Sequence, residues 1–352
     1  MSSPTVPAEM RAVLIHGGKG PSSALYIGEV PTPRISDETP DDVLVKVRAF
    51  ALNRMDLLQR EGQYPVPPGA SPILGVEFSG TVVHRGSGVK DVDIGAPVFG
   101  LATGGAYAEY VRVPASMVIK KDPALSWAQA AVIPEAFLTA FQALHMQSQL
   151  QRGEDVLIHA GASGVGLAAI QVARMLGARH VYVTAGSQQK IDTCKRLGAT
   201  GGFNYKQEDW RSAVLAATDN RGVDVIMDFI GAPYFAANLA CLKRDGRMTM
   251  QGFMGGSVLP KETNLGLLLM KRLRIEGGTL RSRTLAYQSG LVQGFVDRGG
   301  LTGILHGLPG EPSRDITQRL IIYQEFDWHS ISEAQDVMAA NKNVGKIVVH
   351  VS

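Results

Sequence analysis

The 352-residue chain has little net charge. Its 35 Lys and Arg residues against 32 Asp and Glu residues give +3 at pH 7. No run of like charges gathers the basic residues, so nucleic acid is not an expected partner. Charged residues make up 19% and hydrophobic residues 45% of the chain. This balance is typical of folded globular proteins and argues against disorder.

Cysteine and long apolar runs are also scarce. The two cysteines, Cys194 and Cys241, have no metal-ligand spacing and favour a reducing compartment over a disulfide scaffold. Residues 1–9 show no charged segment followed by an apolar one, so no signal peptide is expected. No stretch reaches the ~18 consecutive apolar residues of a membrane span. We therefore expect a cytoplasmic protein with no membrane partner.

Residues 10–135 are predicted to be rich in β-strands. Clusters of Gly, Pro and Asp separate short runs of apolar or alternating residues. These runs are Ala12–Ile15, Val43–Ala49, Phe78–His84, Ala96–Phe99 and Ala108–Val113. The density of turns favours a compact, irregular barrel over a parallel sheet.

From about residue 135, strands alternate with amphipathic helices, which indicates right-handed βαβ units and a doubly wound parallel sheet of the Rossmann type. The predicted strands are Val156–His159, Val181–Thr184, Gly202–Tyr205, Val223–Asp228, Arg247–Met250 and Leu273–Glu276, and the predicted helices are Val165–Gly177 and Lys190–Leu197. Arg281–Arg298 is predicted to be a helix, and Lys346–Val351 a strand that returns to the first domain. The α/β chain would then have a discontinuous domain, 1–134 and 281–352, around a nucleotide-binding domain, 135–280.

Three glycines, Gly161, Gly164 and Gly166, lie between the first of these strands and its helix. A pyrophosphate that approaches the backbone closely leaves no room for a Cβ at Gly164 or Gly166, and the start of the helix offers free N–H groups. The spacing is G-x-x-G-x-G, a variant of the usual G-x-G-x-x-G. A plain tight turn is the alternative. Because strand, glycines, helix and the following βα series agree, we expect a dinucleotide site.

The residues after the second strand bear on which dinucleotide binds. In an NAD site, an acidic residue about 20 positions past the glycines binds the ribose 2′-hydroxyl. The segment Thr184–Lys190 contains no acidic residue. Instead, Ser187 can donate a hydrogen bond and Lys190 lies on the first turn of the next helix. The alternative is that Lys190 is a solvated surface residue. We predict NADPH as the preferred cofactor.

A second group of polar residues lies in the first domain. Asn53, Asp56 and Arg60 have the spacing of one helix face, and the turn at Gly62 then presents Tyr64. We expect Asp56 and Arg60 to form an i,i+4 ion pair that fixes this segment. Asn53 and Tyr64 are the candidates for facing substrate and nicotinamide. No histidine is a convincing catalyst, and His159 is expected to be a hydrogen-bonded core residue.

Together these segments resemble the medium-chain dehydrogenase/reductase superfamily, specifically its zinc-free quinone oxidoreductase branch, and within it the tumour-suppressor-inducible quinone oxidoreductases of animals. The resemblance spans essentially the whole chain. It is carried by residues 51–56, 74–77, 133–142, the glycine loop, 184–188, 202–205 and 341–348. It implies a Rossmann domain and a β-rich, GroES-like catalytic domain. Zinc-dependent members have a Gly-His-Glu motif and a four-cysteine lobe. Here Gly75-Val76-Glu77 stands in place of the motif and the lobe is missing, so no metal is expected.

Matched position by position, the resemblance implies a set of cofactor-binding residues. Ser163–Gly166 would hold the pyrophosphate. Gly186, Ser187, Lys190 and Tyr205 would bind the adenosine 2′-phosphate end. Residues 252–255 and 279–280 would border the nicotinamide ribose. Asn53, Thr139 and Asn343, or Asn341 in its place, would complete the nicotinamide pocket, and Tyr64 would line the substrate side. The full cofactor set is Asn53, Thr139, Ser163, Gly164, Val165, Gly166, Gly186, Ser187, Lys190, Tyr205, Gly252, Phe253, Met254, Gly255, Thr279, Leu280 and Asn343.

The expected reaction is metal-free hydride transfer from NADPH to a quinone. A quinone is already electrophilic and its reduced oxygen takes a proton from water, so the protein need only position the reactants. One alternative is reduction of the C=C bond of an enone or enoyl thioester. Another is a catalytically weak NADPH-binding protein with an RNA-binding or crystallin-like role. The more distant resemblance to zeta-crystallin allows this role, but the balanced charge disfavours it. The resemblance also implies a homodimer or homotetramer formed through the edge strands of the Rossmann sheets.

Overall fold

The computed structural model describes residues 6–308 and 314–352, which divide into two compact units. The first, here called the barrel unit, comprises 6–135, 281–294 and 315–352 of the described residues. The second, the Rossmann unit, comprises 136–280, 295–308 and 314. The Rossmann unit thus includes residues 295–308, which the sequence analysis assigned to the discontinuous domain. Packing explains this, because Phe295 lies against Phe137 and Phe141, with ring centroids 6.2 and 5.6 Å apart.

The barrel unit is built mainly of antiparallel strands. One sheet has the order β14-β15-β3-β4-β5-β7, with β6 also pairing with β3, and β1 pairs with β2 separately. The strands are β1 (Glu9–Ile15), β2 (Leu25–Pro31), β3 (Asp42–Ala51), β4 (Glu77–Arg85), β5 (Pro97–Leu101), β6 (Tyr110–Pro114), β7 (Val118–Lys120), β14 (Ile322–Asp327) and β15 (Lys346–His350). The helices include α1 (Arg54–Arg60), α2 (Trp127–Ala131), α11 (Ile316–Arg319) and α12 (Ile331–Ala339).

Alternation along the strands places large apolar side chains in one core. Phe50, Phe78 and Trp328 are fully buried, and the ring of Phe50 stacks on that of Tyr107 with centroids 4.1 Å apart. Fully burying each such side chain stabilises the fold by about 1.5–3 kcal/mol. This core packs on β3 and β4. It therefore fixes the end of β3, which α1 follows, and the start of β4, to which Gly75–Glu77 leads.

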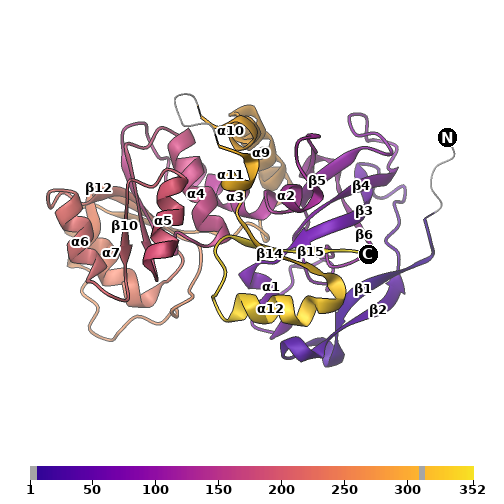
Figure 1. Cartoon of the computed structure of the whole chain (residues 1–352), viewed down its shortest axis with the longest axis horizontal. Helices are drawn as coiled ribbons and strands as arrows, with labels where there is room; N and C mark the ends of the chain where they lie inside the picture. Colours follow the sequence, from indigo (N-terminus) through magenta and orange to yellow (C-terminus); the bar gives the residue numbers. More distant parts are fainter. Residues whose placement is uncertain (1–5, 309–313) are drawn as a thin grey trace. The chain divides into compact units, whose positions relative to one another are not determined.

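The strand predicted at Lys346–Val351 is β15, and it lies inside this sheet. β15 pairs antiparallel with β3 and parallel with β14. In Figure 1 the yellow C-terminal strand accordingly lies among the indigo and violet strands of the N-terminal part. The sequence predicts this return. The other neighbour of β15 is β14, which its sequence pattern does not predict.

The Rossmann unit contains a six-stranded sheet in which every pairing is parallel, with the order β10-β9-β8-β11-β12-β13. This is the doubly wound arrangement of dinucleotide-binding folds, and it confirms the predicted fold class. Its strands are β8 (Asp155–Ile158), β9 (His180–Ala185), β10 (Gly201–Asn204), β11 (Val223–Asp228), β12 (Leu242–Met250) and β13 (Arg274–Gly277). Its helices are α4 (Gly164–Met175), α5 (Gln188–Arg196), α6 (Trp210–Ala217), α7 (Phe235–Cys241), α8 (Gly266–Met270) and α10 (Gly300–His306).

Helices cover both faces of this sheet. On one face, Trp210 of α6 and Leu239 of α7 pack with Leu157, Tyr182 and other strand residues in a single buried cluster. On the other, α4 and α5 contact β8, β9 and β10 (Figure 1). Two helices, α3 (Pro134–Phe141) and α9 (Leu285–Asp297), have residues in both units. No helix among the described residues is long and apolar enough to cross a membrane.

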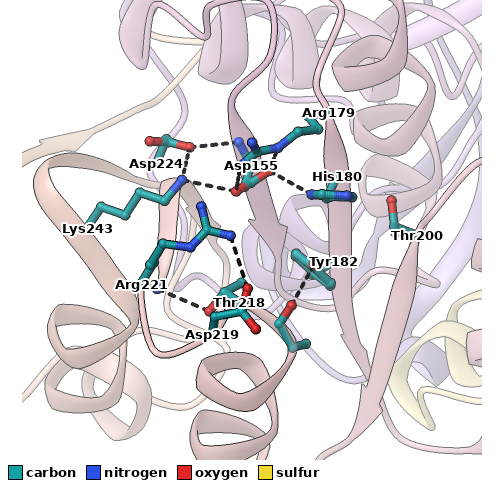
Figure 2. Close-up of polar contacts among 12 residues, drawn as sticks. Asp155, Arg179, His180, Tyr182, Thr200, Thr218, Asp219, Arg221, Asp224 and Lys243 are labelled. Atoms are coloured by element: carbon teal, nitrogen blue, oxygen red, sulfur yellow. Dashed lines mark hydrogen bonds and ion pairs between the residues drawn. The ribbon is translucent and has the colours of Figure 1, made fainter.

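An ion network closes the amino-terminal edge of the sheet (Figure 2). Asp155, at the start of β8, has a side chain that is only 2% exposed and binds Arg179, His180 and Lys243 with distances of 2.6–3.0 Å. Lys243 also binds Asp224 at 2.7 Å. Burial alone would raise the pKa of Asp155, but the hydrogen bonds from its cationic neighbours outweigh it and hold that pKa well below its usual range. The carboxyl ends of the strands, where a cofactor would bind, are at the opposite edge.

Candidate active site

The glycine loop connects β8 to α4. Ser163 caps the helix, its Oγ accepting a hydrogen bond from the N–H of Gly166 at 3.0 Å. A Cβ at residue 166 would lie 2.6 Å from the carbonyl oxygen of Gly161 and nearer still to that of Ala160. Only glycine therefore lets the first turn of α4 fold back this tightly on the loop. The resulting helix start, with its free N–H groups, fits a pyrophosphate.

The predicted 2′-phosphate residues lie together where β9 and β10 end. A Cβ at Gly186 would lie 2.8 Å from the Tyr205 hydroxyl and 3.3 Å from Cε of Lys206. Ser187 caps α5, its Oγ accepting from the N–H of Lys190 at 3.3 Å. Partial burial lowers the pKa of Lys190, and the charge of Lys206 lowers it further. A second lysine therefore shares this site. Lys206 was not among the predicted site residues, although it directly follows Tyr205.

The segment 252–255 follows β12 and is bonded to the loop after β11. Met254 donates its N–H to the Phe229 carbonyl at 2.9 Å, and Gly255 donates to that of Ile230 at 2.8 Å. Asp228 holds the β11 loop in turn by accepting from the N–H of Ile230 at 2.8 Å. Burial raises the pKa of Asp228 to about 6. This arrangement leaves the side chains of Phe253 and Met254 more than half exposed, where a ligand can contact them.

His159, at the end of β8, is a core residue as expected. It is fully buried, with Nε2 2.7 Å from Oδ1 of Asn238 and Nδ1 2.9 Å from the hydroxyl of Thr184. Because the amide oxygen can only accept, Nε2 donates and Nδ1 accepts from Thr184. Burial lowers the pKa of His159 to about 4. It therefore stays neutral and has no proton to exchange near pH 7.

In the barrel unit, Asn53 is held from both sides by a buried ion pair. Its Nδ2 donates to Oε1 of Glu77 at 2.8 Å, and its Oδ1 accepts from Nζ of Lys346 at 2.7 Å. Lys346 and Glu77 are themselves 2.6 Å apart, with side chains 7% and 0% exposed. The second amide hydrogen has only the carbonyl of Ala51, at 3.4 Å. That hydrogen is what Asn53 can offer a ligand.

The predicted ion pair between Asp56 and Arg60 is wrong. The Asp56 carboxylate accepts from the Asn53 N–H at 2.8 Å and from the Tyr107 hydroxyl at 3.0 Å. Arg60 instead bonds Gln335 and Glu61, each at 2.5 Å. The i,i+4 spacing predicts a pair within the helix, but both side chains are buried and have other partners nearer. Burial raises the pKa of Asp56 to about 6.

Tyr64 lies on the segment after α1 and is half-buried. The guanidinium carbon of Arg281 lies 5.8 Å from its ring centroid, within cation–π distance. Burial raises the pKa of Tyr64, Glu135 raises it further and Arg281 opposes both. Tyr64 is thus a neutral phenol near pH 7. It can pack against a planar ligand and donate a hydrogen bond.

The remaining predicted residues are distributed over both units. Thr139 lies on α3, and Thr279 and Leu280 follow β13, so in the Rossmann unit every predicted segment but Thr139 is at the carboxyl edge of the sheet. Asn343 lies just before β15 in the barrel unit, where its Nδ2 donates to the Gly345 carbonyl at 2.8 Å. Asn341 accepts from Arg54 at 2.5 Å. No group of three or more His, Cys, Asp or Glu able to hold a metal occurs among residues 6–308 and 314–352.

Two family models match the chain. The one described as "Alcohol dehydrogenase GroES-like domain" matches residues 39–123, and the one described as "Zinc-binding dehydrogenase" matches residues 164–293. The quinone oxidoreductase-like protein 2 of Rattus norvegicus is 33% identical over 238 residues, which are 68% of this chain and 67% of that protein. A phthioceranic/hydroxyphthioceranic acid synthase of Mycobacterium tuberculosis is also 33% identical over 233 residues, 66% of this chain. The chain spans only 11% of that synthase's length.

Solved structures agree with these matches. The quinone oxidoreductase from Coxiella burnetii superposes with a TM-score of 0.75 at 30% identity, covering 98% of this chain and 100% of that one. Mycobacterial Rv1454c, solved in complex with NADPH, gives a TM-score of 0.81 at 25% identity, covering 97% and 100%. The likeness thus includes both units. On these grounds the chain belongs to the medium-chain dehydrogenase/reductase superfamily and is one of its oxidoreductases.

Proposed function

We propose that the protein reduces quinones with NADPH by hydride transfer that requires no metal. The observation that carries the cofactor assignment is the pair Lys190 and Lys206 beside Ser187 and Tyr205, on a segment without an acidic residue. A carboxylate there would bind a ribose hydroxyl and repel a phosphate, whereas two ammonium groups attract one. The quinone oxidoreductase relatives support the acceptor class.

Bound NADPH would supply the hydride. The start of α4, capped by Ser163, would bind the pyrophosphate, and Lys190 and Lys206 the 2′-phosphate. In the barrel unit, Asn53 would offer the amide N–H that has only a long bond, at 3.4 Å, to the Ala51 carbonyl, and Glu77 and Lys346 would orient it. A buried amide clamped on two sides loses little entropy on binding a ligand, so it can orient a nicotinamide.

Neither Tyr64 nor His159 can act as a strong proton donor near pH 7. Tyr64 keeps its proton and His159 is a neutral, buried residue. This suits an acceptor that is electrophilic without protonation, such as a quinone, whose reduced oxygen can be protonated by water. Within the superfamily, we propose the zinc-free quinone oxidoreductase branch, and within it the tumour-suppressor-inducible members.

The deciding experiment is NADPH oxidation by purified protein with ortho-quinones, para-quinones and enones, each with and without a chelator. Quinones should be turned over faster than enones, and the chelator should change neither rate. Faster turnover of enones would instead assign the alternative function, reduction of a C=C bond. Loss of activity with chelator would contradict a metal-free reaction.

The cofactor preference is tested by Lys190→Ala and Lys206→Ala. A hydrogen bond to a charged group contributes about 1.5–3 kcal/mol, so each variant should raise the KM for NADPH by about 10- to 100-fold and leave the KM for NADH nearly unchanged. Lys195→Ala is the matched control, because Lys195 is an exposed residue of the same helix. Equal losses with both cofactors would show that these lysines do not bind the 2′-phosphate.

We also propose that two copies of the chain pair through β13. This strand ends the sheet order, and no described strand pairs with its outer edge. Apolar residues just before it are strongly exposed, namely Leu265 (51%), Leu269 (82%) and Met270 (66%). An antiparallel pairing centred on Ile275 would set Arg274 opposite Glu276 of the partner subunit, so the strand is complementary in charge to itself. A homodimer follows from one such pairing, and a homotetramer would need a further surface.

A further inference from the structure

The guanidinium of Arg281 is left with an unused donor group by its neighbours. Arg281 belongs to the barrel unit and is only 5% exposed. Its Nε donates to the Thr103 carbonyl at 2.7 Å, and its Nη1 donates to Oε1 of Gln59 at 2.6 Å. Its Nη2 is buried and has no hydrogen-bond partner. Two N–H groups of a permanently charged side chain therefore have no acceptor.

The surrounding backbone makes this arrangement rigid. Gln59 donates its own Nε2 to the Pro72 carbonyl at 3.0 Å, so its amide cannot turn toward Nη2. Gly104 has a φ of +154°, and a Cβ there would lie 3.1 Å from Nη2 and 2.5 Å from the Ser71 carbonyl. A side chain at residue 104 would therefore crowd both Nη2 and the Ser71 carbonyl, and glycine avoids this. An unpaired buried donor of this kind is costly unless a ligand satisfies it.

The charge of Arg281 is partly offset by its neighbours. Burial lowers the pKa of Arg281, while Asp56, Tyr64 and Glu135 act to raise it. A neutral oxygen that accepts a hydrogen bond would satisfy Nη2 without placing another negative charge near Asp56 and Glu135. The ring of Tyr64, 5.8 Å from the guanidinium carbon, provides the aromatic surface on which a planar molecule carrying such an oxygen could pack.

We propose that Nη2 of Arg281 binds a carbonyl oxygen of the electron acceptor, which makes Arg281 a specificity-determining residue. The reaction class rests on the proposed function, but the oxygen contact does not. When a conjugated carbonyl acceptor gains a hydride, the π electrons of its C=O bond move onto oxygen, which then takes a proton from water. A guanidinium that is held in place and shielded from solvent stabilises the negative charge that develops on the oxygen.

The test compares two ligands that differ in the oxygen alone, 1-tetralone and tetralin, whose binding is measured by ligand-observed NMR without turnover. Arg281→Met should weaken 1-tetralone binding by about 10- to 100-fold, the range of a hydrogen bond to a charged group, and leave tetralin binding unchanged. Arg283→Met is the matched control. Arg283 is exposed two residues away and packs on Tyr287 at 4.8 Å. It should affect neither ligand.

Each other outcome has a definite meaning. Equal weakening of both ligands would show that Arg281 only supports the fold, and no weakening would show that Nη2 holds solvent; either result overturns the proposal. So does a wild-type protein that does not bind 1-tetralone at millimolar concentration. If Arg281→Met does not fold, Arg281→Lys replaces the planar fork by one ammonium and serves the same comparison. A wild type that binds 1-tetralone through Arg281 but reduces no quinone would refute the proposed function and leave this contact standing.

Discussion

Asp155 offers the sharpest test of what stabilises the Rossmann unit. The substitution Asp155→Asn keeps the size and shape of the side chain but removes its charge. In the native protein the carboxylate accepts from Nε and Nη2 of Arg179 at 2.9 and 2.6 Å, from Nδ1 of His180 at 2.9 Å and from Nζ of Lys243 at 3.0 Å (Figure 2). The amide oxygen of the variant can still accept hydrogen bonds. Its NH₂ group, however, takes the place of the second carboxylate oxygen and faces N–H donors, to which it cannot bond.

The expected loss in the free energy of unfolding is smaller than that from breaking a fully buried ion pair. Breaking a buried ion pair costs about 3–5 kcal/mol when the remaining charge has no other partner. Here Arg179 and His180 are 44% and 40% exposed and can turn to water, while Lys243 keeps Asp224 at 2.7 Å. We therefore expect a loss of about 2–3 kcal/mol in the free energy of unfolding. For a unit of this size that lowers Tm by roughly 4–12 °C.

Thermal and urea unfolding, followed by circular dichroism, measure this loss. Asp219→Asn is the matched control, because Asp219 forms an exposed pair with Arg221, with side chains 86% and 55% exposed. It should change stability by less than about 0.5 kcal/mol. The pKa of Asp155 is lowered in the folded state. Its contribution is therefore complete above the unfolded pKa of about 3.9 and is lost as pH falls below it. The gap between wild type and variant should narrow in acid. A loss no larger than that of Asp219→Asn would refute the reasoning.

The remaining predictions concern the glycine loop and the sheet edge. Gly166→Ala forces a Cβ to within 2.6 Å of the Gly161 carbonyl oxygen and should weaken NADPH binding about 5- to 150-fold, the effect of about 1–3 kcal/mol of overpacking. Fluorescence titration checks this against Gly290→Ala, whose added Cβ meets nothing within 4 Å; equal affinities would contradict it. Glu276→Arg places like charges opposite each other across the β13 pairing and should yield monomers in light scattering. Exchanging the charges with Arg274→Glu in the same chain should restore the dimer, and a dimeric single variant would rule out this interface.

The sequence was informative wherever a local pattern determines local structure. Alternating and apolar runs gave every described strand but β2, β7 and β14 to within about five residues, and the glycines marked the turn into α4. The return of β15 to the barrel unit also followed, because no helix comes after it. By contrast, β14 was missed, since Ile322–Asp327 has exposed residues on its outer side and shows little apolar pattern.

The partners of the site residues could not be predicted, because they come from distant parts of the chain. Asn53 binds Glu77, 24 residues away, and Lys346, 293 residues away. Spacing along a helix suggested Arg60 as the partner of Asp56, but burial redirected both side chains. Lys206 could have been found from its place at the end of a strand next to Tyr205. Arg281 could not, since only the fold brings it to Gln59 and Thr103.

The position of β15 has a consequence for how the protein is made. This strand lies between β14 and β3, and its first residue, Lys346, completes the bonding of Asn53. During synthesis, residues 136–280 can begin to collapse on the ribosome as soon as they emerge. Strand β6 pairs with residues 42–46 of β3, but Ala49–Ala51 on the same edge have no strand to pair with until about 300 further residues have been translated. A chaperone that shields this edge during synthesis should therefore contact the nascent chain at Ala49–Ala51.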